Sequence, residues 1–158
     1  MQETINRLRN KKGDEGFTLI ELLVVVVIIG VLVAIAVPVY LNYRKGAADK
    51  SAQSDVRGAV SAVEQFYTDH SNTYPDTQAT GTAGTGFVLA AASATGGSTQ
   101  TITVSDKTLL SYVKSSDGQS YTLCGTNSGG SGKWYVYNSL NGGSVKAASG
   151  TLTLATCA

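Results

Sequence analysis

The chain has 158 residues, which is enough for one folded domain and an N-terminal segment. Charged residues make up 15 % of it and the formal net charge is +1, so it has neither the basic footprint of a nucleic-acid-binding protein nor a polybasic membrane patch. Beyond residues 1–16 there are eight basic and eight acidic side chains, and such a neutral surface favours self-association over electrostatic capture of a charged partner.

The first 16 residues are polar, and their basic side chains are Arg7, Arg9, Lys11 and Lys12. We interpret residues 1–16 as a cytoplasmic leader that processing removes. The alternative is the start of an ordinary secretory signal, because Ala34-Ile35-Ala36 resembles a signal-peptidase site after an apolar run. The length of the run and the charge inside it disfavour that alternative. Arg44 and Lys45 follow the run on its far side, so the positive-inside rule indicates the orientation only weakly.

An apolar stretch covers residues 17–41, and no polar side chain occurs between Leu22 and Val37. As a helix, these residues would be roughly 37 Å long, enough to cross a hydrocarbon layer of about 30 Å. A soluble domain of this size has no place for a helix that is apolar all round. Residues 17–41 are therefore predicted to form a transmembrane helix.

Glu21 is the only charged residue in this stretch. A carboxylate at the centre of a bilayer costs on the order of 3 kcal/mol, so it needs a partner, and the span contains no cationic side chain. A cut before Phe17 would create an α-amine four residues away. That amine is tied to its own helix end, so the amine of a neighbouring subunit is the more natural partner. The alternative is that Glu21 extends to the lipid headgroups.

The motif Gly16-Phe17-Thr18-Leu19-Ile20-Glu21, at the head of a bilayer-length apolar run, resembles the processing site of type IV prepilins. The same family includes type II secretion pseudopilins and competence pilins. The resemblance covers residues 1 to about 75. It implies that a membrane peptidase cuts between Gly16 and Phe17 and methylates the new amine of Phe17, while Glu21 stays in the helix and takes part in assembly.

Gly30 and Pro38 weaken the apolar helix. Pro38 lacks the N–H that would bond the Ala34 carbonyl, and Gly30 costs about 1 kcal/mol relative to alanine. A local break or kink is therefore easy here. Both residues also resemble the positions where the helix of this family loosens during filament assembly.

Residues 42–75 are predicted to continue the helix to near His70 with an amphipathic pattern. Its apolar stripe consists of Ala48, Ala52, Val56, Ala59, Val63 and Phe66. The other face carries Arg44, Lys45, Asp49, Lys50, Asp55, Arg57 and Glu64. Pro75 and the turn-forming residues before it end the helix.

Residues 76–158 are predicted to form a small β-domain. Residues 76–100 read as a linker or surface loop with one apolar patch at 86–92. Strands are expected over residues 100–105, 108–114, 119–126 and 133–138, and more weakly over 151–156, as an antiparallel meander. Together with the helix this gives an α+β type IV pilin fold: a long N-terminal helix, hydrophobic first and amphipathic second, packed on a small antiparallel sheet.

Two cysteines, Cys124 and Cys157, are expected to form a disulfide if the residues after 41 lie outside the membrane. The alternative is two buried free thiols. Two cysteines and the distant His70 provide too few ligands for a metal site.

Several other sites are not supported. Residues 127–133 superficially resemble a phosphate loop. However, Asn127 occupies the position of the first required glycine, and Trp134 occupies the position that requires Ser or Thr. An aromatic sugar platform at residues 134–137 is a minor alternative to a core-and-surface strand. His70 is interpreted as a polar residue at the helix end. No catalytic or cofactor motif is recognised, so the chain is interpreted as a non-enzyme without a cofactor.

The resemblance implies a structural subunit of a type IV pilus that supports adhesion, motility or DNA uptake. The expected partners are further copies of the chain, the prepilin peptidase, the membrane assembly machinery and, before assembly, membrane lipid, with no direct nucleic-acid partner. The expected locations are the cytoplasmic membrane and then the extracellular filament.

Within the family, a major pilin is favoured over a minor pilin or pseudopilin. The long leader and residues 46–75 most resemble pilins of Gram-positive, actinobacterial type, whereas a disulfide ending near the C-terminus resembles Gram-negative ones. Two alternatives lie outside the filament reading. One is a membrane-anchored binding module that never polymerises, and the other is a secreted ligand-binding domain released after Ala36.

Overall fold

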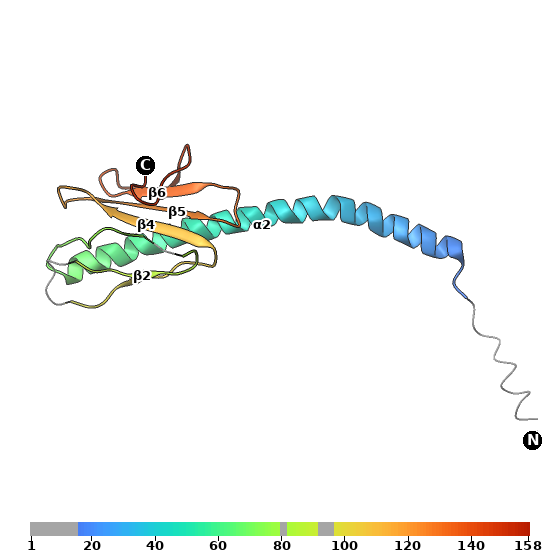
Figure 1. The fold of residues 1–158 in the computed structure, drawn as a ribbon, viewed down its shortest axis with the longest axis horizontal. Helices are drawn as coiled ribbons and strands as arrows, with labels where there is room; N and C mark the ends of the chain where they lie inside the picture. Colours follow the sequence, from blue (N-terminus) through green and yellow to red (C-terminus); the bar gives the residue numbers. More distant parts are fainter. Residues whose placement is uncertain (1–15, 80–81, 92–96) are drawn as a thin grey trace, which may run out of the picture. The chain divides into compact units, whose positions relative to one another are not determined.

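The computed structural model describes residues 16–79, 82–91 and 97–158, so the predicted leader lies outside it except for Gly16. The elements are α2 (Leu19–Asp69), β1 (Gln78–Ala79), β2 (Phe87–Val88), β3 (Thr101–Ile102), β4 (Thr108–Lys114), β5 (Tyr121–Asn127), β6 (Trp134–Asn138) and β7 (Lys146–Ala147). Figure 1 labels α2, β2, β4, β5 and β6. One long helix followed by antiparallel strands confirms the predicted α+β class. The chain divides into two compact units, Met1–Tyr40 and Leu41–Ala158, and α2 runs through both.

In the first unit, α2 is apolar, and no residue that the structure describes packs against it. All residues from 16 to 40 are exposed, and this part of α2 is long and apolar enough to cross a membrane. Gly30 and Pro38 both lie inside the uninterrupted helix. The helix is therefore not broken at either residue in this state, and their loosening stays a prediction about assembly.

In the second unit, one stripe of α2 is buried. The predicted stripe is confirmed for Ala52, Val56, Ala59, Val63 and Phe66, whereas Ala48 is only partly buried. The prediction that Asp49 lies on the polar outer face is wrong, because only 4 % of this residue is exposed. Its carboxylate instead accepts hydrogen bonds from the backbone N–H and the hydroxyl of Ser131.

Five strands form an antiparallel sheet in the order β1-β4-β5-β6-β7, and β2 pairs with β3 in a separate ribbon. The predicted strand over residues 108–114 is confirmed at both ends, and those over 119–126 and 133–138 are confirmed with shifted ends. Of the strand expected over 100–105, only Thr101–Ile102 forms, and it pairs with β2 in the ribbon and not with the strands of the predicted meander. The strand predicted over 151–156 is wrong, since residues 151–153 belong to no strand and residues 154–156 form a turn before the disulfide at Cys157. β1, β2 and β7 were not predicted.

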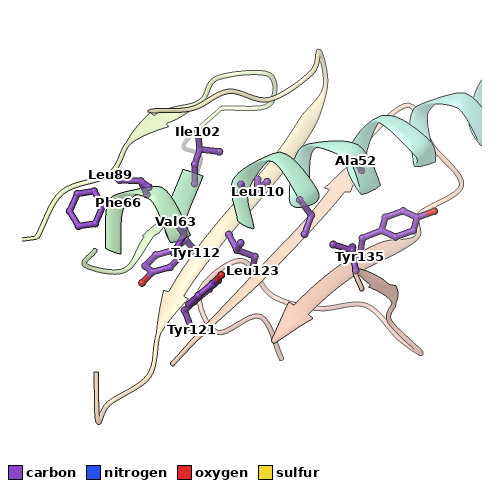
Figure 2. Close-up of a cluster of buried hydrophobic side chains, with 13 residues drawn as sticks. Ala52, Val63, Phe66, Leu89, Ile102, Leu110, Tyr112, Tyr121, Leu123 and Tyr135 are labelled. Atoms are coloured by element: carbon purple, nitrogen blue, oxygen red, sulfur yellow. The ribbon is translucent and has the colours of Figure 1, made fainter. Parts of the chain in front are cut away.

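The core lies on both sides of the second half of α2. Figure 2 shows Val63 and Phe66 of α2 with Leu110, Tyr112 and Leu123 of the sheet on one side, and with Ile102 of β3 and Leu89, which follows β2, on the other. The helix approaches β5 closely at Gly125, where an added Cβ would lie 2.9 Å from Cγ2 of Val56. Any larger residue at this position would push α2 away from the sheet.

The other face of the sheet is covered at its centre by the end of the chain. Cys124 of β5 is bonded to Cys157, with 5.5 Å between the two Cα atoms, and both are buried. The register places Cys124 between Ser111 of β4 and Val136 of β6. The predicted disulfide is confirmed, and it fixes the C-terminal segment onto the middle strand.

Candidate assembly site at the start of the helix

Thr18 and Glu21 form a reciprocal pair at the start of α2. The N–H of Glu21 donates to Oγ1 of Thr18 at 3.3 Å, and the N–H of Thr18 donates to Oε2 of Glu21 at 2.8 Å. The Thr18 hydroxyl also donates to Oε2, at 2.6 Å. Because Leu19 is the first helical residue, Thr18 is the N-cap and Glu21 is the third helical position, which together make a capping box.

This box gives Glu21 a partner within its own chain. The first N–H groups of a helix lack intrahelical acceptors, and an anion there also interacts favourably with the helix dipole. Sequence reasoning missed this role, although the spacing T-x-x-E before an apolar run is its recognised signal. The carboxylate that looked like an isolated charge therefore completes the helix end.

The second carboxylate oxygen of Glu21 remains open. Within residues 16–79, 82–91 and 97–158, Oε1 of Glu21 makes no hydrogen bond or ion pair, and the residue is exposed. Gly16 and Phe17 precede the helix in an exposed, non-helical segment, with 77 % of Phe17 exposed. The predicted cleavage position, the capping box and the start of the apolar helix therefore lie within the six residues from Gly16 to Glu21.

Comparison with known proteins identifies the family. The family described as "Prokaryotic N-terminal methylation motif" matches residues 11–37. The fimbrial protein EcpC of Eikenella corrodens is 34 % identical over 127 residues, which cover 78 % of this chain and 82 % of the relative. The type IV major pilin protein PilE of Neisseria gonorrhoeae is 30 % identical over 128 residues, covering 77 % of this chain and 73 % of the relative. The chain belongs to the type IV pilin family.

A further relative comes from a type II secretion system. The type II secretion system core protein G of Aeromonas hydrophila is 35 % identical over 68 residues, which cover 43 % of this pilin chain and 47 % of the relative. None of these three relatives is actinobacterial, so they add nothing to the resemblance to pilins of that type. No solved structure matches the chain significantly.

Acidic residues on the second half of α2 bind this pilin's helix to its strands and loops. The carboxylate of Asp55 accepts the N–H and the hydroxyl of Ser105, each at 2.9 Å. Glu64 accepts the Tyr121 hydroxyl at 2.6 Å. Burial, followed by this hydrogen bond and the charge of Glu64, holds the pKa of Tyr121 well above its usual value. With Asp49, three residues predicted on the solvated face of α2 therefore contact the domain.

The remaining candidates from the sequence are His70, the aromatic residues of β6 and a possible metal site. His70 follows the end of α2, is buried, stacks on the Phe66 ring at 3.8 Å, and has its Nδ1 2.9 Å from the Phe66 carbonyl oxygen. In β6, Tyr135 faces the core, while Trp134 and Val136 are partly exposed on the other face. No cluster of three or more potential metal ligands occurs among the residues that the structure describes.

Proposed function

We propose that the chain is the structural subunit of a type IV pilus, made as a precursor and cut between Gly16 and Phe17 by a prepilin peptidase. The new amine of Phe17 is methylated, residues 17–41 hold the subunit in the cytoplasmic membrane, and the same helix then packs in the extracellular filament. The membrane assembly machinery transfers the subunit from one environment to the other.

The observation that carries this proposal is the combination of an exposed apolar helix with an unsatisfied carboxylate oxygen at its start. An apolar surface of this extent needs lipid or other helices around it. In a filament, Oε1 of Glu21 would accept the methylated amine of Phe17 on a neighbouring subunit, while Oε2 stays in the capping box. That pairing would set the axial offset between adjacent subunits.

The similarity to a type II secretion core protein favours a second candidate, a pseudopilin of a secretion-like system. A membrane-anchored module that never polymerises is the third. Electron microscopy of material sheared from cells distinguishes them: long surface filaments that contain this chain support the pilin, whereas short or absent filaments support the other two.

Processing is tested with Gly16→Val. The peptidase reading requires a residue without a Cβ before the cut, so this variant should remain in the membrane as the full-length precursor. Mass spectrometry of the parent should give a chain that begins with methylated Phe17. Normal maturation of Gly16→Val would exclude the proposed cleavage.

Assembly is tested with Glu21→Leu, with Ile20→Leu as the matched control in the same helix turn. Loss of one member of a buried charge pair costs about 3–5 kcal/mol, and in a polymer every subunit contact bears that loss. Glu21→Leu should be expressed, cleaved and held in the membrane, yet give few filaments, while Ile20→Leu assembles normally. Normal filament number from Glu21→Leu would refute the pairing.

A further inference from the structure

A small hollow lies where the first turns of the second unit's helix meet two loops of the sheet. Its volume is about 250 Å³, slightly below the roughly 300–1,000 Å³ of typical ligand sites. It is lined by Arg44, Ala47, Ala48 and Ser51 of α2 and by Asp106, Lys107, Asn127 and Gly129 of the two loops. Its size suits a small polar group.

The hollow is lined by two cations and one carboxylate. Within the part of the chain that the structure describes, the side chains of Arg44, Lys107 and Asp106 form no ion pair or hydrogen bond with one another or with other residues. Lys107 has a left-handed backbone, with φ of 62°, and its carbonyl accepts the N–H of Ser128 at 3.0 Å. A lysine in this costly conformation indicates that the loop geometry is set by its surroundings.

Small residues keep the hollow open, and its backbone N–H groups are already in use. The groups that contact a bound ligand must therefore be side chains. A Cβ at Gly129 would lie 3.2 Å from Oδ1 of Asn127 and 3.8 Å from Cβ of Ala48, so any larger residue there would fill the space. The backbone N–H groups of residues 128–131 already donate to protein oxygens. A bound anion would therefore have to be held by Arg44 and Lys107.

With residues 17–41 in lipid as proposed, Arg44 in the lining of this hollow would lie at the level of the lipid headgroups. In the continuous helix, Arg44 follows the last apolar residue of the predicted span, Leu41, by three residues, or about 4.5 Å of rise. Tyr40 and Tyr43 flank the same turn and are 63 % and 79 % exposed. Tyrosines and basic residues concentrate at the level of lipid headgroups.

We propose that this hollow binds the headgroup of a zwitterionic aminophospholipid while the subunit waits in the membrane. The phosphate contacts Arg44 and Lys107, and the primary ammonium contacts Asp106, so the two charges of the headgroup match the two signs of charge in the lining. An anionic headgroup without an ammonium leaves Asp106 facing a negative charge. The inference rests on the proposed function, because it requires residues 17–41 to lie in lipid.

The test is native mass spectrometry of the processed chain in detergent. The chain is titrated separately with phosphatidylethanolamine, phosphatidylcholine and phosphatidylglycerol. Phosphatidylethanolamine should bind most tightly. Arg44→Gln and Lys107→Gln should each weaken it about fivefold. Asp106→Asn should remove its advantage over the other two lipids. Lys45→Gln is the matched control, since Lys45 carries the same charge next to Arg44 but does not line the hollow.

Three outcomes would overturn the proposal. The first is equal binding of the three lipids by the parent chain. The second is an equal effect of Lys45→Gln and Arg44→Gln, which would indicate general surface charge. The third is that soluble phosphoethanolamine binds as tightly as the lipid, which would show that the hollow does not recognise a membrane lipid. Filaments should also be counted by electron microscopy for the same variants. Glu21 and the cleavage site are unchanged in them, so a failure of lipid binding can be told apart from a failure of the proposed function.

Discussion

At the scale of single residues, the two oxygens of Glu21 have different surroundings. Oε2 completes a capping box with Thr18, while Oε1 is open. One side chain can therefore satisfy its own helix end and still accept a cation from another subunit. In the proposed assembly, the capping box would hold the charge in place beforehand, so the subunit would not need to reorganise it when a neighbour arrives.

Thr18→Ala should weaken assembly through Glu21. Loss of an N-cap hydroxyl costs about 1 kcal/mol in water, and the freed N–H of Glu21 would find no water to replace it in lipid. We expect fewer filaments from Thr18→Ala and near-normal numbers from Thr18→Ser, which keeps the hydroxyl. Intact mass must first show that both variants are cleaved. Equal filament counts from the two variants would mean that the capping box does not contribute.

Asp49 illustrates a buried carboxylate whose partners come from far along the chain. Ser131→Ala removes the hydroxyl that donates to Oδ2 of Asp49, and a hydrogen bond to a charged group contributes about 1.5–3 kcal/mol. Urea unfolding of the chain in detergent should show a loss of that size. Ser116→Ala, at an exposed turn, should stay within about 0.5 kcal/mol of the parent. Equal midpoints for the two variants would contradict the role of this contact.

At the scale of elements, long and strongly patterned segments are predictable and two-residue strands are not. The apolar stripe of α2 and the strand over residues 108–114 follow from side-chain spacing that local sequence displays. β1, β2 and β7 have two residues each, too few to show a period of two. They form because a neighbouring strand pairs with them, and that pairing depends on residues outside the two-residue segment itself.

The disulfide should stabilise the domain without affecting processing. Cys124 and Cys157 are 33 residues apart, and closing such a loop contributes about 3–4 kcal/mol on the chain-entropy model. Cys124→Ser should lower the unfolding midpoint and leave cleavage after Gly16 intact. The non-reduced parent should have an intact mass about 2 Da below the dithiol value, since each thiol loses one hydrogen. Free thiols that titrate without reductant in the exported protein would show that the bond does not form.

At the scale of the whole molecule, buried tyrosines set how the domain responds to alkali. Burial raises the pKa of Tyr112 and of Tyr121 well above the usual value near 10, and hydrogen bonding to Glu64 adds to the effect at Tyr121. Below pH 10 both the folded and the unfolded states keep these protons. Above it, the unfolded chain releases them first, so the free energy of unfolding falls as pH rises.

Urea midpoints should therefore decrease as the pH rises above about 10, and tyrosinate absorbance of the buried rings should appear together with unfolding. Tyr121→Phe should be less stable at pH 7 because Glu64 loses a donor, yet show a smaller decrease in alkali. Thiol exchange does not complicate the measurement, because both cysteines are in the disulfide. Full ionisation of Tyr112 and Tyr121 in a still-folded chain would disprove this account.

The residues of the candidate assembly site are proposed from the sequence, and their role in assembly stays a prediction, while the contacts that the structure shows could be predicted only in part. Gly16, Phe17 and Glu21 stand in a local motif, so the sequence displays them directly. The acids Asp49, Asp55 and Glu64 could not be placed, because helical periodicity puts them on the polar face while their partners Ser131, Ser105 and Tyr121 lie on distant strands and loops. Periodicity shows which face of a helix is apolar, but it does not show which polar groups on the other face find hydrogen-bond donors on distant strands and loops.

The disulfide also determines how the domain would respond to pulling. A filament under tension transmits force along its chains, and a domain that unravels lengthens by the contour of each released residue. The residues between Cys124 and Cys157 form a covalently closed ring, so force applied outside the ring cannot extend them. At about 3.4 Å per residue, roughly 110 Å of chain is withheld from extension. Extension of the chain beyond Tyr121 would therefore stop within a few residues at Cys124, and the residues inside the ring could be stretched out only if the disulfide were broken.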